Sequence, residues 1–287
     1  MSDNLFFKIA LVMMLLSGLT SCGQLISNAK QEFADDLAST ILESNDPETI
    51  KRGVPAYLIL ISSMIKGDPD NPDLLEAGAS LYGTYASTFV DSVESKQALA
   101  SKAFEYASHA ICIRNENFCD VKSLSYFEYE QNIQKMDKVQ ATYLFVFASS
   151  WAGVIEANSS DWNAVAELPK VKASMQRVIE LDETVVNGNA HVYMAVLESL
   201  LPPSLGGKPE LAKKHFERAI EISNNSNLMA KVLYAEKYAR LLFDRELHDK
   251  LLNEVLAVDT WPKEQTLTNT LAKQKAKILL ADADDYF

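Results

Sequence analysis

Apolar residues recur at helical spacing along almost the whole chain, from about residue 31 to its end. No segment of that region alternates apolar and polar residues over the length of a strand between turn dipeptides. The pattern therefore predicts an all-α fold, with one helical domain over residues 31–287.

Capping residues followed by proline mark two of the helix starts. Asp46 precedes Pro47, and Asn71 precedes Pro72, so each start places a capping side chain before a proline in the first turn. Pro55 lies inside an apolar helical pattern, where it removes one backbone donor. We therefore expect a bend or a division of the helix at that point.

One eight-residue motif occurs four times. It places a small or apolar residue at its fifth and eighth positions in all four copies and at its first position in three, while His248 stands first in the last copy. In the tetratricopeptide (TPR) pattern such a motif belongs to the second helix of a hairpin, which nests against the first. The spacing is irregular, which predicts degenerate TPR-like stacked hairpins, an α-solenoid. The motifs cover 100–107, 171–178, 212–219 and 248–255, with candidate first helices at 73–90, 137–157, 188–201 and 227–243 and a further helical pair near 27–66.

The N-terminus has the features of a bacterial lipoprotein signal. An apolar run over residues 5–18 is followed by Leu19-Thr20-Ser21-Cys22, which resembles the lipobox that directs cleavage before a lipidated cysteine. We expect a signal peptide over 1–21, lipidation of Cys22 and a linker over 22–30. Gly23 favours the outer membrane over retention in the inner one. The weaker alternatives are a transmembrane anchor, for which the run is short, and an ordinary secretory signal.

Charge excludes two classes of partner. The chain has 27 Lys and Arg against 39 Asp and Glu, a net charge of -12. A nucleic-acid role needs clustered cationic charge, and an acidic surface repels anionic lipids. We expect no nucleic-acid partner and membrane attachment through the lipid anchor only.

The chain lacks the motifs that carry most catalytic chemistry. Its four histidines show no metal-ligand spacing, and no nucleotide-binding or nucleophile-elbow motif occurs, so we expect neither a metal nor another cofactor. Two Ser-x-x-Lys matches, Ser27 to Lys30 and Ser63 to Lys66, stand without the elements that accompany them in penicillin-recognising enzymes. The sequence therefore argues against an enzyme.

Aromatic residues form two stripes on the candidate first helices. Each stripe recurs at helical spacing, so it faces one side of its helix. Such a stripe can fill the interface between helices, or it can line an apolar channel to which hydroxyl and indole N–H groups add polar contacts. The channel candidates are Tyr82, Tyr85 and Phe89 on one helix and Tyr143, Phe147 and Trp151 on the other.

Two further cysteines leave two alternatives open. Cys112 is expected at the end of a helix, and Cys119 follows a short loop. An exported protein can form a disulfide between them, whereas two free buried thiols are the common alternative.

Several segments are similar to a known family of helical lipoproteins, the T component associated with tripartite ATP-independent periplasmic (TRAP) transporters. The resemblance covers nearly the whole mature chain and includes a Pro-Ser-Leu-Gly-Gly connector and an acidic, aromatic terminus. It implies a periplasmic trimer of TPR-like protomers with internal channels that engages the transporter's solute-binding protein. The similar segments are 71–75, 85–90, 151–155, 167–171, 203–207, 215–220 and 281–287.

Two hypotheses of different classes follow. In the first, a trimeric lipoprotein docks the solute-binding protein and relays an apolar or amphipathic ligand. In the second, the chain is a TPR scaffold for outer-membrane protein assembly without a small-molecule ligand. An enclosed cavity beside the aromatic residues would favour the first.

Overall fold

A computed structural model describes residues 33, 36–201, 203–205 and 207–287. Within them the chain is almost entirely helical and no strand occurs, which confirms the all-α prediction. The signal peptide, Cys22 and the linker over 22–30 lie outside the described residues. No helix in the described part of the chain is both long and apolar enough to span a bilayer.

The expected caps begin the first two long helices. Asp46 accepts hydrogen bonds from the backbone of Glu48 and Thr49 at the start of α2 (Pro47–Gly67). Asn71 does the same for α3 (Pro72–Phe89). In each case a side-chain oxygen satisfies backbone donors that have no partner within the helix.

Pro55 does not divide its helix, contrary to one of the two expected outcomes. The carbonyl of Lys51 would normally accept a bond from the backbone N–H of residue 55, which proline lacks. The hydroxyl of Tyr85 donates to that carbonyl instead, at 3.1 Å. A side chain of the neighbouring helix thus replaces the missing donor, and α2 continues through the proline.

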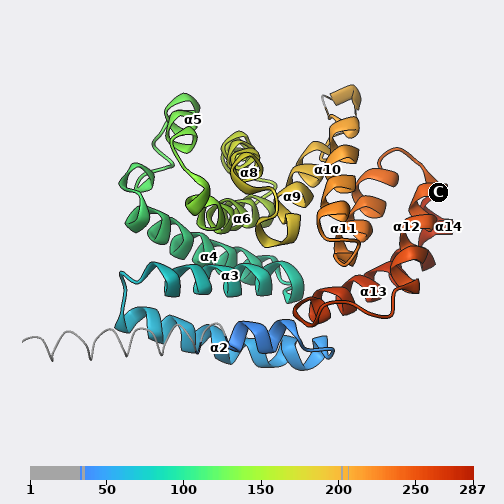
Figure 1. Ribbon diagram of the computed structural model, residues 1–287, viewed down its shortest axis with the longest axis horizontal. Coiled ribbons are helices and arrows are strands. Elements are labelled where there is room, and N and C mark those ends of the chain that lie inside the picture. Colours follow the sequence, from blue (N-terminus) through green and yellow to red (C-terminus); the bar gives the residue numbers. More distant parts are fainter. Residues whose placement is uncertain (1–32, 34–35, 202, 206) are drawn as a thin grey trace, which may run out of the picture.

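Helical hairpins follow one another along an arc (Figure 1). The residues at positions one, five and eight of all four motifs are buried on the second helices, as the TPR-like pattern predicts. The successive pairs are α3 with α4 (Val93–Arg114), α6 (Ala141–Ala157) with α8 (Leu168–Asp182), α9 (Asn189–Glu198) with α10 (Pro209–Ile222), and α11 (Leu228–Leu233), extended by a π-helix η5 (Tyr234–Ala239), with α12 (Arg245–Ala257).

Shorter elements connect and flank these hairpins. Residues 36–42 are helical ahead of α2, and α13 follows α12. The remaining elements are η1 (Glu116–Phe118), α5 (Tyr126–Gln134), η2 (Lys138–Gln140), α7 (Trp162–Val165), η3 (Val185–Gly188), η4 (Pro203–Leu205), η6 (Lys263–Gln265), α13 (Thr266–Ala281) and α14 (Ala283–Tyr286).

The two ends of the arc meet. Helix α13 turns back toward α2 in Figure 1, and Leu267 of α13 packs in one small apolar cluster with Val54 of α2 and Phe89 of α3. Larger apolar cores fill the hairpins on either side of this contact. The solenoid is therefore closed into a ring, which sets the geometry of the space inside it.

Candidate functional site

A cavity of about 2100 Å³ lies inside the ring. Its wall is built mainly by the first helices α3, α6, α9 and α11, together with α13 and the start of α2. Among the described residues, the second helices α4, α10 and α12 contribute nothing to the wall, whereas the second helix α8 contributes Leu168 and Lys172 near its start. First helices therefore line most of the inner surface, as expected for a TPR-like stack, and α8 is the exception.

Large apolar side chains remain solvent-exposed on this inner wall. Trp162 on the short helix α7 is 84% exposed, Ile278 on α13 is 67% exposed and Leu200 after α9 is 53% exposed, and all three line the cavity. Apolar surface that stays open to water within a concave site is typical of binding sites. Single apolar residues scattered over a surface are common and do not indicate binding.

The aromatic stripe on α3 divides between cavity and core. Tyr85 and Phe89 line the cavity. Tyr82 does not: its hydroxyl donates to the carbonyl of Leu58 at 3.1 Å and lies 2.8 Å from the hydroxyl of Ser62, so it ties α3 to α2. The ring of Tyr82 also packs edge-on against Tyr106 of α4, with ring centroids 5.8 Å apart, so Tyr82 faces the interface with α2 and α4 and not the cavity.

None of the expected α6 residues lines the cavity. Trp151 is 2% exposed and packs against Phe147 and Phe104 in the largest core, with ring centroids 5.4 Å away in both cases. Tyr143 lies at the other end of the helix, under the guanidinium of Arg114. Helix α6 is covered by neighbours on several sides, so its bulky residues fill interfaces.

Two aromatic residues of the wall were not predicted from the sequence. Trp162 follows its N-cap Asp161 on a helix too short to show periodicity. Tyr193 on α9 packs edge-on against Phe145, and burial raises the pKa of its hydroxyl to about 12. In the sequence, the one indication of this part of the wall is Trp162 itself, a tryptophan directly after the polar run 158–161.

A strained turn forms part of the wall. Val186 and Asn187, both lining residues, have φ angles of 47° and 58°, and Gly188 follows with a φ of 77°. A β-branched residue rarely adopts this left-handed conformation, which costs about 1–3 kcal/mol. Glycine is required at the third position, because an added Cβ would lie 3.1 Å from Ile222. The fold therefore holds Val186 against the cavity at an energetic cost.

Charged residues on the wall differ in balance from the rest of the protein. The chain as a whole is strongly acidic, whereas the wall carries four lysines and three glutamates. The lining residues of this kind are Lys172, Lys208, Lys237 and Lys275 with Glu156, Glu198 and Glu264.

Comparison with known families identifies the chain. The family model described as TRAP transporter T-component matches residues 43–287, which include every helix from α2 to α14. The chain belongs to this family. A comparison with curated proteins gave no match. As a T component, the chain is associated with a TRAP transporter.

Behind the wall of this T component lies a partly buried network of charged and titratable groups, formed by Glu183 at the end of α8 and by residues of α9 and α10. The Nδ1 atoms of His191 and His215 are 2.8 Å apart, and His191 Nε2 lies 3.3 Å from Glu183. Arg218 donates to Glu183 at 3.0 Å and, together with His191, lowers the pKa of that carboxyl to about 2.

Burial opposes charge on both imidazoles. Desolvation lowers the pKa of His191, and desolvation together with the neighbouring His191 lowers that of His215 to about 4. Both rings are therefore neutral near pH 7, and one N–H donates to the facing nitrogen of the other ring. Glu183 precedes the strained turn in the chain and His191 follows it, and both α9 and α10 pack against that turn.

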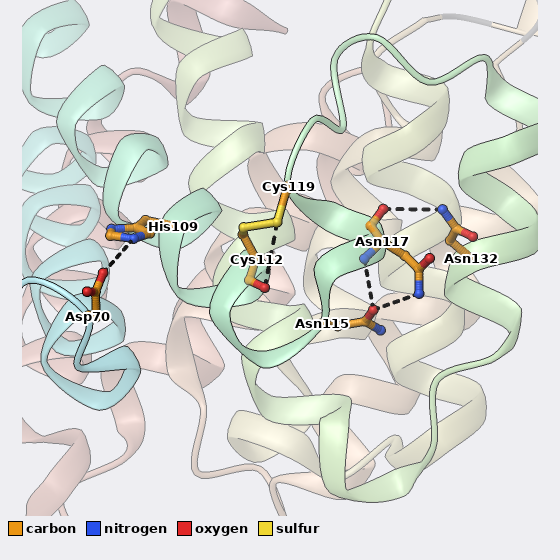
Figure 2. Close-up of a disulfide and its surroundings, with 7 residues drawn as sticks. All are labelled: Asp70, His109, Cys112, Asn115, Asn117, Cys119 and Asn132. Carbon is orange, nitrogen blue, oxygen red and sulfur yellow. Dashed lines mark hydrogen bonds and ion pairs between the residues drawn. A yellow bond between two sulfur atoms is a disulfide. The ribbon is translucent and has the colours of Figure 1, made fainter.

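A disulfide joins Cys112 at the end of α4 to Cys119 just after η1, with the Cα atoms 4.4 Å apart (Figure 2). In the intervening turn the side chain of Asn115 accepts a hydrogen bond from the backbone of Asn117 at 3.2 Å. The bridge fixes the turn that carries the fully buried Phe118 into the core. Neither Cys112 nor Cys119 lines the cavity, so the bridge acts on the packing of this turn.

The Ser-x-x-Lys match on α2 lies away from the cavity wall. Ser63 and Lys66 are exposed on the outer face of α2, while Ser27 and Lys30 lie outside the described residues. Within the described part of the chain, no group of three or more His, Cys, Asp or Glu side chains is arranged to hold a metal ion.

Proposed function

We propose that this T component docks the solute-binding protein of its TRAP transporter and holds an apolar or amphipathic ligand in the central cavity for transfer between the two proteins. The observation that carries the proposal is the closed ring of helices around an open, largely apolar cavity. Pockets for drug-sized ligands enclose roughly 300–1,000 Å³. A space of about 2100 Å³ has room for a long-chain ligand.

The proposal includes the location and assembly of the protein. We propose that the chain is periplasmic, is attached through a lipid on Cys22 to the outer membrane, and forms a trimer. The sequence of residues 5–22 supports the anchor, and membership of the family supports the transporter association. The chain from residue 23, exported behind a cleavable secretory signal that replaces residues 1–22, carries neither the lipid nor the apolar run. Light scattering of this unlipidated chain at tens of micromolar should give about three times the protomer mass, and a monomer would contradict the trimer.

Exposed aromatic residues are frequent anchors of protein interfaces. Trp162 lies on the cavity wall and is exposed, so we propose that the solute-binding protein docks over this side of the ring. A photo-crosslinking amino acid at position 162 tests this in cells. The matched control is the same amino acid at position 59, which replaces an exposed isoleucine on the outer face of α2.

The expected product is an adduct from position 162 that mass spectrometry identifies as the TRAP solute-binding protein, with none from position 59. An adduct with outer-membrane assembly proteins instead would favour the TPR scaffold. Equal adducts from both positions would contradict docking at the cavity.

A further inference from the structure

Two lysines on the cavity wall share one carboxylate. Lys275 on α13 lies 2.8 Å from Oε2 of Glu236, and Lys237 on η5 lies 3.4 Å from the same oxygen. The side chain of Glu236 is 20% exposed and does not line the cavity, whereas Lys237 and Lys275 are more exposed and both line it. This cluster therefore carries one uncompensated positive charge.

Outside this cluster, the charges on the wall match in number. Lys172 is paired with Glu198 at 2.5 Å, and Glu156 is paired with Lys96 at 3.6 Å. The remaining two charged lining residues, Lys208 and Glu264, are of opposite sign. The surplus at Lys237 and Lys275 is thus a feature of this cluster. It persists in a protein whose net charge of -12 would not by itself attract an anion.

Burial and charge act in opposite directions on Glu236. Burial disfavours its ionised form, but the hydrogen bond and charge of Lys275, with the charge of Lys237, lower its pKa below the ordinary value. The carboxyl is therefore ionised near pH 7, and it neutralises only one of the two lysines. A second anion would complete the pairing of the cluster.

The surplus charge adjoins apolar surface on the same helix face. Leu271, Lys275 and Ile278 of α13 are spaced four and three residues apart, so they share one face, and all three line the cavity. Leu271 also packs at the seam where α13 meets α2. An apolar chain lying along this face would place its polar end beside the ammonium groups.

We propose that Lys237 and Lys275 form a head-group subsite for an anionic single-chain amphiphile whose acyl chain lies along the Leu271 and Ile278 face of the cavity. This inference rests on the proposed function, since it requires that the cavity holds a ligand. A cationic head group would meet like charge, and a neutral one would leave the surplus charge unpaired.

Competition binding tests the subsite. The unlipidated chain from residue 23 needs no detergent, and the neutral fluorophore 1-N-phenylnaphthylamine reports occupancy of the cavity. Decanoate, decanol and decyltrimethylammonium, which share one chain length and differ in head-group charge, then compete below their micellar concentrations.

We expect decanoate to compete about tenfold more strongly than decanol, as hydrogen bonds to a charged group allow. Lys275→Met and Lys237→Met should each remove that preference and leave decanol binding unchanged. Glu236→Gln should strengthen decanoate binding severalfold, because it removes the competing carboxylate. Lys250→Met, at an exposed position on α12 outside the cavity wall, is the matched control and should change nothing.

Four results would overturn the subsite. If the fluorophore binds but decanoate and decanol compete equally, the proposed function stands and the head-group subsite fails. A preference for decanoate that survives Lys275→Met and Lys237→Met also removes the subsite. Sedimentation with phosphatidylglycerol vesicles separates the sources of the anion: lysine-dependent vesicle binding without decanoate binding would assign the lysines to a membrane surface. If neither fluorophore nor amphiphile binds, the proposed function fails as well.

Discussion

The hydroxyl of Tyr85 donates to the backbone carbonyl of Lys51, the acceptor that Pro55 leaves without its helical donor. The same tyrosine lines the central cavity. One side chain therefore stabilises α2 across its proline and fixes the wall of the candidate site, so that helix integrity and cavity shape are linked at this point.

Tyr85→Phe should lower the free energy of unfolding by about 1 kcal/mol, since it leaves a backbone acceptor unpaired. In a Pro55→Ala background the backbone N–H of residue 55 can bond to Lys51, so the same substitution should cost less than half as much. Urea unfolding of the four proteins gives the cycle. Equal costs in both backgrounds would show that the tyrosine does not replace the missing donor.

Truncation of two tryptophans should lower the free energy of unfolding by very different amounts. Trp151→Ala should lower the free energy of unfolding by about 3–5 kcal/mol, because it empties a fully packed aromatic core. Trp162→Ala should cost less than about 0.5 kcal/mol, since the side chain is exposed on the cavity wall. Urea unfolding of both variants is the measurement, and a similar loss for both would contradict the placement of Trp162.

The His191 and His215 pair should make stability depend on pH in a defined window. In the unfolded chain a histidine binds a proton below about pH 6.5, whereas in the fold both pKa values are lowered, that of His215 to about 4. The unfolded state therefore binds more protons between these values, and the free energy of unfolding falls as pH falls through this range. Allowing for partial solvent screening, the loss should be about 2 kcal/mol.

Other groups around the pair do not mimic this effect. Glu183 and Arg218 face His191, and Glu198 and Lys172 face His215. The pKa of Glu183 is lowered to about 2, so its stabilising contribution is lost only below about pH 4.5. Urea unfolding between pH 7.5 and 5 isolates the histidines. His215→Gln should flatten the profile, and an unchanged slope would contradict the assignment.

Sequence patterns predicted the architecture because helical periodicity and capping act locally. The motif residues Ala212, Phe216 and Ala219 are all buried, as their positions in the motif require. Helix starts at Pro47 and Pro72 follow from their caps. Closure of the ring could not be predicted, because it depends on a contact between Leu267 and Val54, which are far apart in the chain.

The candidate site was only partly predictable. A stripe shows that residues share a helix face, but it does not show what that face meets, so Tyr85 reaches the cavity while Trp151 enters the core. Lys237 lies on a π-helix, whose altered turn changes the direction in which side chains point. No spacing in the sequence indicates that it shares Glu236 with Lys275.

The central claim is that an amphiphile occupies the cavity, and intrinsic fluorescence tests it most directly. Among the three tryptophans, Trp162 lines the cavity wall. Titration of the unlipidated chain from residue 23 with decanoate should give a saturable blue shift that disappears in Trp162→Phe and in a folded Leu271→Asp variant. An emission spectrum that decanoate and decanol leave unchanged would contradict the account.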